Sequence, residues 1–144
     1  MQVPGLRSPH DKVGALVYFG RMLDKIRLQA KSALPAEFQT NLGEGFDRTC
    51  AQFLGVPYQE IAGHLQHRAT DEETLEWCRS RGRRASEDEI FVWNEFMRKR
   101  GWNDAASERL RQRKAEGGFD TRDDIQTMFD YIDADEGRPL RPQP

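Results

Sequence analysis

The sequence has only two cysteines, Cys50 and Cys78, and both fall within helical patterns. So few cysteines argue against a disulfide framework and are typical of small core residues in a reducing compartment. Cys78 lies beside Arg79, as an activated thiol could, but it shares a helical stripe with Leu75. We therefore predict a core role for both thiols.

Long apolar runs are also absent. The longest nearly apolar run, Gly14 to Gly20, is far too short to span a bilayer, and the opening residues have no signal-peptide core. Hydrophobic residues make up 37% of the 144 residues and recur with helical periodicity, which argues against disorder. The net charge of −2 gives no general attraction to nucleic acid or membranes. We therefore expect a cytoplasmic protein without membrane contacts.

The short motifs of several enzyme classes are missing as well. The sequence contains no P-loop, no GxGxxG, no GxSxG, no HExxH and no CxxC. Glu60, His64 and His67 share one helical stripe and could supply zinc ligands, but an exposed helix face would show the same residues. We expect no metal and no cofactor.

Helical periodicity fills most of the chain, and no stretch shows sustained strand-type alternation. The stretch from Ser8 to Lys31 is predicted as one long helix, with Ser8 as its N-cap and Pro9 at its first position. The predicted buried stripe of this helix consists of Ala15, Leu16, Phe19, Met22, Leu23, Ile26 and Ala30.

Capping residues divide the rest of the chain into shorter helices. Thr70 and Ser86 each begin a capping box, Asn103 or Asp104 begins a more polar helix, and Thr121 caps the last one. The predicted core stripe behind Ser86 contains Ile90, Trp93, Phe96 and Met97. The predicted fold is all-α, an irregular bundle of about seven helices around the long N-terminal helix.

The chain is long enough for one domain with a real core. We predict a single helical domain over residues 1–136, because each half alone would have a thin core, with a lobe boundary near 79–86 as the alternative. Residues 137–144 are rich in proline and are predicted to form an extended tail.

Charged residues share the second face of the predicted first helix. In one interpretation, Arg21 and Asp24 form a solvated i, i+3 pair and Lys25 points into water. In the other, neighbouring helices cover this face, and Arg7, Arg21 and Lys25 bind an anion while Asp24 orients Arg21. Arg7, Arg21, Asp24 and Lys25 are the candidate ligand-binding residues.

Half of the basic residues fall between Arg79 and Lys114, where they could follow a phosphate backbone. The segment that follows is acidic and could neutralise them. Nucleic-acid binding through residues 79–114 is therefore an alternative function and not the leading one.

Five motifs, spread over nearly the whole chain, occur in order: RSPxxKxG (Arg7 to Gly14), RMLDKIR (Arg21 to Arg27), FLGVPY (Phe53 to Tyr58), TDEExxEWC (Thr70 to Cys78) and DEGR (Asp135 to Arg138). Together they resemble a bacterial domain family of unknown function. The resemblance implies a small bacterial cytoplasmic protein, and it brings no activity, cofactor or catalytic residue.

The leading hypothesis is a binding module that recognises a small anionic ligand or a protein partner through the polar face of the first helix. An enzyme that uses the same cleft, with Asp24 as acid/base and Arg21 or Lys25 as electrostatic stabiliser, is an alternative. An enzyme should have a water-excluding pocket with a carboxylate of shifted pKa, whereas a module should expose an apolar patch, for example around Trp77 or Trp102. The sequence does not predict the oligomeric state.

Overall fold

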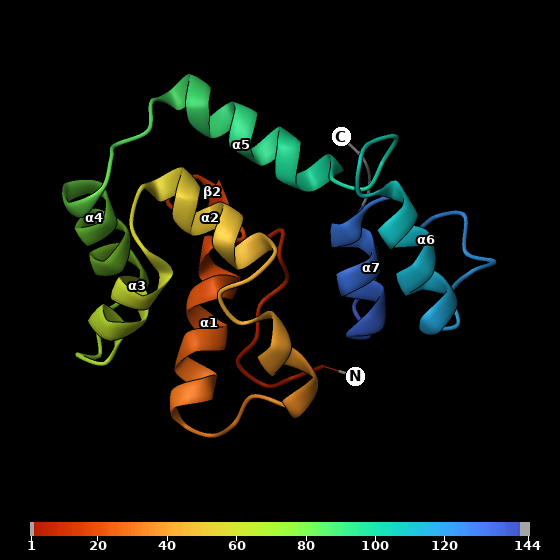
Figure 1. The fold of residues 1–144 in the computed structure, drawn as a ribbon, viewed down its shortest axis with the longest axis horizontal. Coiled ribbons are helices and arrows are strands. Elements are labelled where there is room, and N and C mark those ends of the chain that lie inside the picture. Colours follow the sequence, from red (N-terminus) through yellow and green to blue (C-terminus); the bar gives the residue numbers. More distant parts are fainter. Residues whose placement is uncertain (1, 142–144) are drawn as a thin grey trace.

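The computed structural model describes residues 2–141, and this part of the chain is mostly helical (Figure 1). Its elements in order are β1 (Lys12–Val13), β2 (Leu16–Val17), α1 (Phe19–Ala30), the 3-10 helix η1 (Ala36–Asn41), α2 (Phe46–Leu54), α3 (Tyr58–Leu65), α4 (Asp71–Arg81), α5 (Glu87–Lys99), α6 (Ser107–Glu116) and α7 (Met128–Asp135). None of these helices is long and apolar enough to cross a membrane. The predicted helical character is confirmed, but the all-α class is wrong, because a small hairpin opens the fold.

The predicted long helix from Ser8 to Lys31 is wrong in its first half. β1 and β2 pair antiparallel there, and Gly14 begins the turn between them with a φ of +61°. A Cβ at Gly14 would lie 2.6 Å from Cδ2 of Leu75, so both the backbone angle and the packing require glycine. Tyr18, with a φ of +73°, separates the hairpin from α1.

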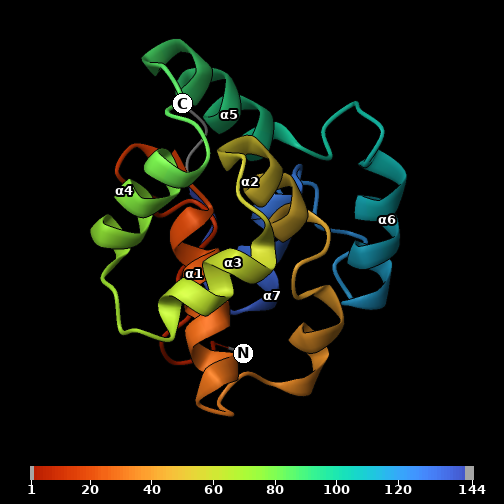
Figure 2. The ribbon, with the colours of Figure 1, turned by 60° about the vertical axis from the view of Figure 1, so that its left-hand side comes forward.

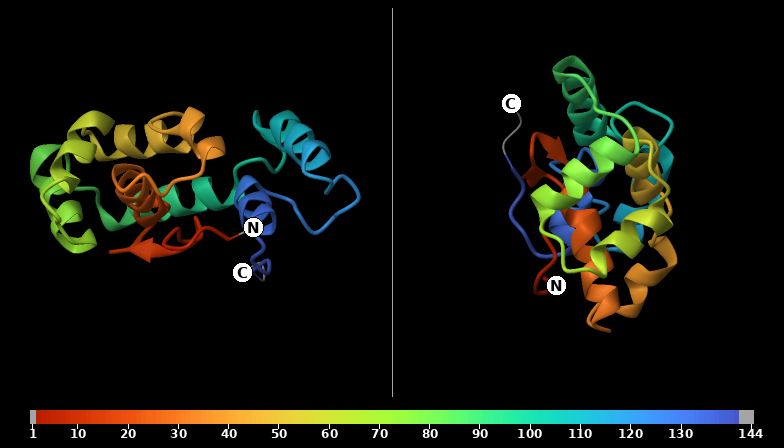
Figure 3. Two further views of the ribbon diagram at one scale, coloured as in Figure 1. Left: turned by 90° about the horizontal axis from the view of Figure 1, so that it is seen from below. Right: turned by 90° about the vertical axis from the view of Figure 1, so that its left-hand side faces the viewer.

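The helix α1 is shorter than predicted but remains central (Figures 1 and 2). The hairpin lies on one side of it and α2 and η1 lie on the other (Figure 3, left), while α3 packs beside it. Four of the five stripe residues that lie within α1 are buried, namely Phe19, Met22, Leu23 and Ile26. Ala15 and Ala30, predicted for the same stripe, are exposed.

The helix α5 runs along one edge of the molecule, from the α4 end to the α6 and α7 end (Figure 1). Two of its side chains form hydrogen bonds with the backbone of the hairpin. The Asn94 side chain accepts a hydrogen bond from the Val17 backbone N–H and donates one to the Ala15 carbonyl, while Nε1 of Trp93 donates to the Val17 carbonyl. The backbone groups of β2 are thus satisfied by a helix rather than by a third strand.

The helix starts follow the predicted capping chemistry in two places. Both capping boxes, at Thr70 and Ser86, are confirmed, with side chain and backbone bonded in each direction. The last two starts are wrong. The helix α6 begins at Ser107, and α7 is capped by Thr127, whose side chain accepts from the N–H three residues on, rather than by Thr121.

One hydrophobic core cluster contains side chains from both sides of the predicted lobe boundary near 79–86, because α5 and α7 contribute to the same cluster as α1 to α4. This supports the single domain over 1–136, which stays a prediction. Of the predicted tail, residues 138–141 have no regular secondary structure, and residues 142–144 lie outside the described part.

Candidate functional site

The polar side of α1 is covered rather than solvated. Arg21, Asp24 and Lys25 are only 4%, 7% and 5% exposed. The interpretation as a solvated i, i+3 pair is therefore wrong. Because a buried charge is stable only when it is paired, the partners of these residues decide what this face can do.

Arg21 pairs with Glu136, in the turn that follows α7. Nη1 and Nη2 of Arg21 lie 2.9 Å and 2.5 Å from the two carboxylate oxygens of Glu136, and Nη1 also donates to the Arg7 carbonyl. Arg138 donates to the same carboxylate at 2.6 Å. Burial alone would favour the neutral form of each side chain, lowering the pKa of Arg21 and raising the pKa of Glu136. The attraction between them outweighs burial, so the pKa of Arg21 is raised and the pKa of Glu136 is lowered.

Lys25 belongs to a second buried group. Its Nζ lies 2.8 Å from Oδ1 of Asp47 and 3.1 Å from Oη of Tyr18, and the Tyr18 hydroxyl donates to the same Asp47 oxygen at 2.6 Å. The other oxygen of Asp47 accepts from the Gly43 N–H. Burial lowers the pKa of Lys25, while burial and the Asp47 carboxylate together raise the pKa of Tyr18 well above its ordinary value.

Arg7 forms the centre of a third, half-exposed group. Its Nε and Nη2 each donate to one oxygen of Asp24 at 2.9 Å, and its Nη1 donates to Asp71 at 2.8 Å. Arg27 donates to the second oxygen of Asp71. Burial would raise the pKa of Asp71, but the two guanidinium groups outweigh it and lower that pKa. Asp24 thus orients Arg7 rather than Arg21.

All four candidate ligand-binding residues therefore have ionic partners within the chain. Arg7 and Arg21 meet where Nη1 of Arg21 reaches the Arg7 carbonyl, while Lys25 belongs to the separate group around Asp47. An anion at these cations would compete with carboxylates that are already bonded to them. Ligand binding by Arg7, Arg21, Asp24 and Lys25 stays a prediction.

Sequence reasoning missed the carboxylates that complete these groups, namely Asp47, Asp71 and Glu136. Glu136 lies 115 residues beyond Arg21, and Asp71 lies 64 residues beyond Arg7. No local spacing could pair them. The available signal was that Asp71 and Glu136 fall in the TDEE and DEGR motifs, while their cationic partners fall in the two opening motifs.

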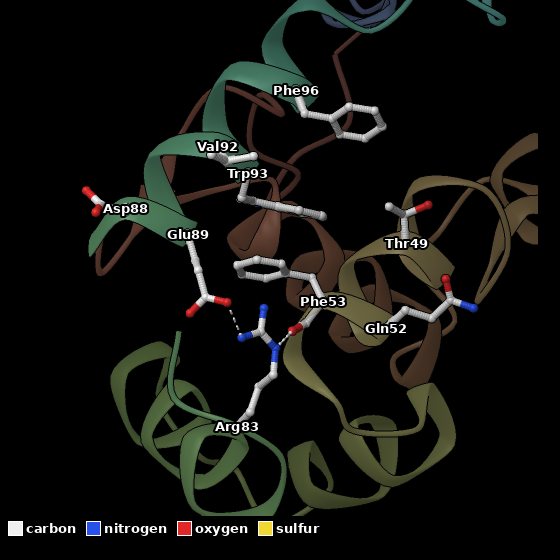
Figure 4. A pocket seen from close by; sticks show the side chains of 9 residues that line it. All are labelled: Thr49, Gln52, Phe53, Arg83, Asp88, Glu89, Val92, Trp93 and Phe96. Carbon is white, nitrogen blue, oxygen red and sulfur yellow. Dashed lines mark hydrogen bonds and ion pairs between the residues drawn. The ribbon is translucent and has the colours of Figure 1, made fainter. Parts of the chain in front are cut away.

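A groove of about 580 Å³ lies between α2 and α5 (Figure 4). The rings of Phe53 and Trp93 stack within it, with centroids 4.6 Å apart. At one end, Arg83 lies over the Phe53 ring, donates to the Phe53 carbonyl and pairs with Glu89 at 2.8 Å. The remaining lining residues are Thr49, Gln52, Asp88, Val92 and Phe96.

Large apolar side chains of α5 are exposed beside this groove. Phe91 and Val92 are each 65% exposed and Phe96 is 45% exposed, so the prediction that Phe96 is a core residue is wrong. Trp102, just after α5, is exposed as well, whereas Trp77 is half-buried and stacks on His64. An apolar patch therefore exists, and it lies on α5 rather than around Trp77.

The basic residues of 79–114 are mostly paired with nearby carboxylates. Arg79 and Arg84 contact Glu76, Arg81 contacts Glu60, Arg83 contacts Glu89, Arg98 and Lys99 contact Glu95, Arg100 contacts Asp104, and Arg111 contacts Glu108. A phosphate backbone would compete with these pairs, most of which are exposed and individually weak. Nucleic-acid binding stays an untested alternative.

Glu60, His64 and His67, which were considered as zinc ligands, do not converge on a common point. Glu60 pairs with Arg81, and the His64 ring stacks on Trp77 with centroids 4.3 Å apart. Within residues 2–141, no three His, Cys, Asp or Glu side chains converge as a metal site would require.

These features define a small, predominantly helical domain with a charged network around its central helix and an apolar groove on one side. The chain belongs to DUF5069, a family of domains of unknown function, whose family model matches residues 3–138. The predicted resemblance to a family of unknown function is thereby confirmed, and the family brings no activity. No curated protein matches the chain.

Proposed function

We propose that this chain is a protein-interaction module whose binding surface is the exposed apolar side of α5, together with the groove between α2 and α5. The observation that carries the proposal is the exposure of Phe91, Val92 and Phe96 next to an aromatic groove. Large apolar side chains exposed in this way are unfavourable in water and are typical of surfaces that a partner covers.

The occupant we propose is an amphipathic helix of a partner protein. Such a helix presents large apolar side chains along one face, which a surface laid along another helix can receive. The Phe53 and Trp93 rings offer a flat aromatic contact, while the half-buried Thr49 and the exposed Gln52 on the α2 side have small or polar side chains. The Arg83–Glu89 pair gives the groove a polar end.

The network around α1 supports a structural role better than the predicted anion site or an acid/base role for Asp24. Both oxygens of Asp24 accept hydrogen bonds from Arg7, and the guanidinium of Arg21 is held by Glu136. A ligand would have to break these contacts, and leaving one partner of a buried ion pair uncompensated costs about 3–5 kcal/mol.

We further propose that the protein works in the bacterial cytoplasm. The motifs that carry the family resemblance support the bacterial origin. The two cysteines support a reducing compartment, because both are free thiols buried in the core.

The interaction surface can be tested with a displayed library of helical peptides. We expect the purified protein to enrich peptides with large apolar residues at helical spacing. Amide NMR shifts on binding should map to α2 and α5. Because Val92 is exposed, Val92→Glu should leave the fold intact and remove the enrichment.

A matched control replaces another exposed helical residue by glutamate at a distance from the groove. Arg109→Glu on α6 serves this purpose, and it should bind the same peptides as the wild type. Equal enrichment by Val92→Glu, or a shift map centred outside α2 and α5, would show that this surface is not the binding site.

A further inference from the structure

The outward side of α5 carries a row of side chains that is complementary to itself. The inward side is fixed by Trp93 and Met97, which are buried in the core. The opposite side follows the spacing i, i+3, i+4, i+7, i+8 and i+11, which keeps residues on one stripe of a helix. This outward stripe consists of Asp88, Phe91, Val92, Glu95, Phe96 and Lys99.

We propose that the partner helix is the α5 of a second copy of this chain, packed antiparallel across a twofold axis. The proposal rests on the interaction surface proposed above and names its occupant. In such an isologous contact the same stripe serves on both sides, so each pairing occurs twice.

The register follows from the spacing within the stripe. When the axis passes midway along α5, Asp88 of one copy faces Lys99 of the other, and Phe91 faces Phe96. Val92 then faces Glu95, whose carboxylate stays bound to Arg98 of its own chain at 2.7 Å. Asp88 and Lys99, whose charges meet across the axis, lie at the ends of the stripe, and the phenylalanines lie inside them. Glu95, which lies beside the axis, is neutralised by Arg98 of its own chain.

Charge selects the antiparallel arrangement. The first turn of α5 is acidic and its last turn is basic, so a parallel pair would place like charges together. Asp88 is exposed and, within residues 2–141, has no ion-pair partner, so its carboxylate is available to a second chain. Lys99 is exposed too, and its contact with Glu95 is a long one at 3.3 Å.

The apolar residues of the stripe place a side chain of the second copy at the groove. Phe96 lines the groove, so Phe91 of the second copy, which faces Phe96, is placed at the edge of the groove beside Phe53 and Trp93. The two phenylalanine pairs related by the axis would remove from water the side chains that are 65% and 45% exposed in the single chain.

The contact is small. The stripe covers 11 helical steps, or about 16 Å of helix at ~1.5 Å per residue. One helix pair of this length buries less than a standard interface of about 1,600 Å², so we expect a weak dimer with a dissociation constant in the micromolar range.

The test uses charge reversals in the full chain, measured by sedimentation velocity over micromolar to millimolar concentrations. Wild type should show a reversible monomer–dimer equilibrium. Asp88→Lys and Lys99→Asp each place two like-charged contacts across the axis and should weaken association by about tenfold or more. A mixture of the two variants restores both attractive contacts, so it should form heterodimers as tightly as wild type.

Matched reversals outside α5 are the controls. Asp120→Lys and Lys12→Asp change the same charges at exposed positions, and both should associate like wild type. A wild type that stays monomeric throughout the range overturns the second-copy proposal, while the peptide-library experiment still decides the interaction surface independently. Association that both reversals leave unchanged, with no preference in the mixture, also overturns it.

Discussion

The thiol of Cys78 shows how strongly this core excludes water. Cys78 packs in the same cluster as Leu75, and burial raises its pKa from 9.0 to about 12. At neutral pH it therefore carries its proton and lacks the thiolate that a nucleophile needs. The core role predicted from its stripe is confirmed. Burial raises the pKa of Cys50 as well.

A raised thiol pKa predicts a loss of stability at alkaline pH. The unfolded thiol releases its proton near its ordinary pKa of 9.0 while the folded one retains it up to about 12. The stabilisation is thus complete below pH 9 and falls as the pH rises. Between about pH 8 and about pH 11, Cys78 should account for about 2–3 kcal/mol of the loss in unfolding free energy.

Urea unfolding of Cys78→Ala at the two pH values checks this. The variant should be less stable than wild type at both, because it leaves a cavity, but its stability should fall less with pH. Val56→Ala, a buried apolar truncation in the same core, controls for the cavity and should keep the wild-type pH dependence. An unchanged pH dependence in Cys78→Ala would contradict the prediction.

At the scale of elements, the two threonines near α7 give a direct comparison. Thr127 accepts a hydrogen bond from the Asp130 N–H and caps α7, whereas Thr121 is exposed and outside any helix. Thr127→Ala should reduce the unfolding free energy by about 0.5–2 kcal/mol, while Thr121→Ala should change it by less than about 0.5 kcal/mol. Thermal or urea unfolding of both variants measures the difference, and equal losses would mean that the cap contributes nothing.

The helix starts that sequence reasoning predicted correctly depend only on neighbouring residues. The capping boxes at Thr70 and Ser86 are complete within four residues of chain, so their chemistry is visible in the sequence. Thr121 offers the same residue types with Asp124 three residues on. No helix begins there, since Asp124 pairs with Arg122 and α7 begins only at Met128.

The hairpin was missed for the opposite reason. Its turn depends on Leu75 contacting Gly14, and its backbone groups are satisfied by Asn94, 77 residues beyond Val17. The local pattern of Leu16 and its apolar neighbours fits a helix equally well. Tertiary contacts favour the hairpin over the helix, and these contacts involve residues far along the chain. The first 31 residues alone therefore do not predict the hairpin.

At the scale of the whole molecule, ion pairs connect the two ends of the chain to the central helix. Arg21 on α1 reaches Glu136, and Arg138 binds both Glu136 and the Leu6 carbonyl. The polar face of α1 could be identified from sequence as special. Its partners could not, because they meet only when the chain has folded. The sequence therefore predicted the cations of the network and Asp24, and it left out Asp47, Asp71 and Glu136.

Because Arg138 binds Glu136 and the Leu6 carbonyl, we expect it to be the last residue that the fold requires, and the match to the family also ends there. Within the described residues, a chain shortened after Arg138 loses the exposed ion pair between Arg141 and Asp11 and the half-buried side chain of Leu140. It should lose less than about 1 kcal/mol of unfolding free energy. A chain shortened after Asp135 lacks Glu136 and leaves Arg21 buried without its partner, which should cost about 3–5 kcal/mol.

Glu136→Gln in the full-length chain distinguishes the loss of the Glu136 charge from the loss of the residues after Asp135. The substitution keeps the shape of the side chain and removes only its charge. Urea unfolding should place it close to the chain that ends at Asp135, because both leave the Arg21 guanidinium uncompensated. If the two shortened chains are equally stable, or if Glu136→Gln matches wild type, the ion pair does not hold the end of the chain to α1, and the polar face of that helix is free to act as the predicted ligand site.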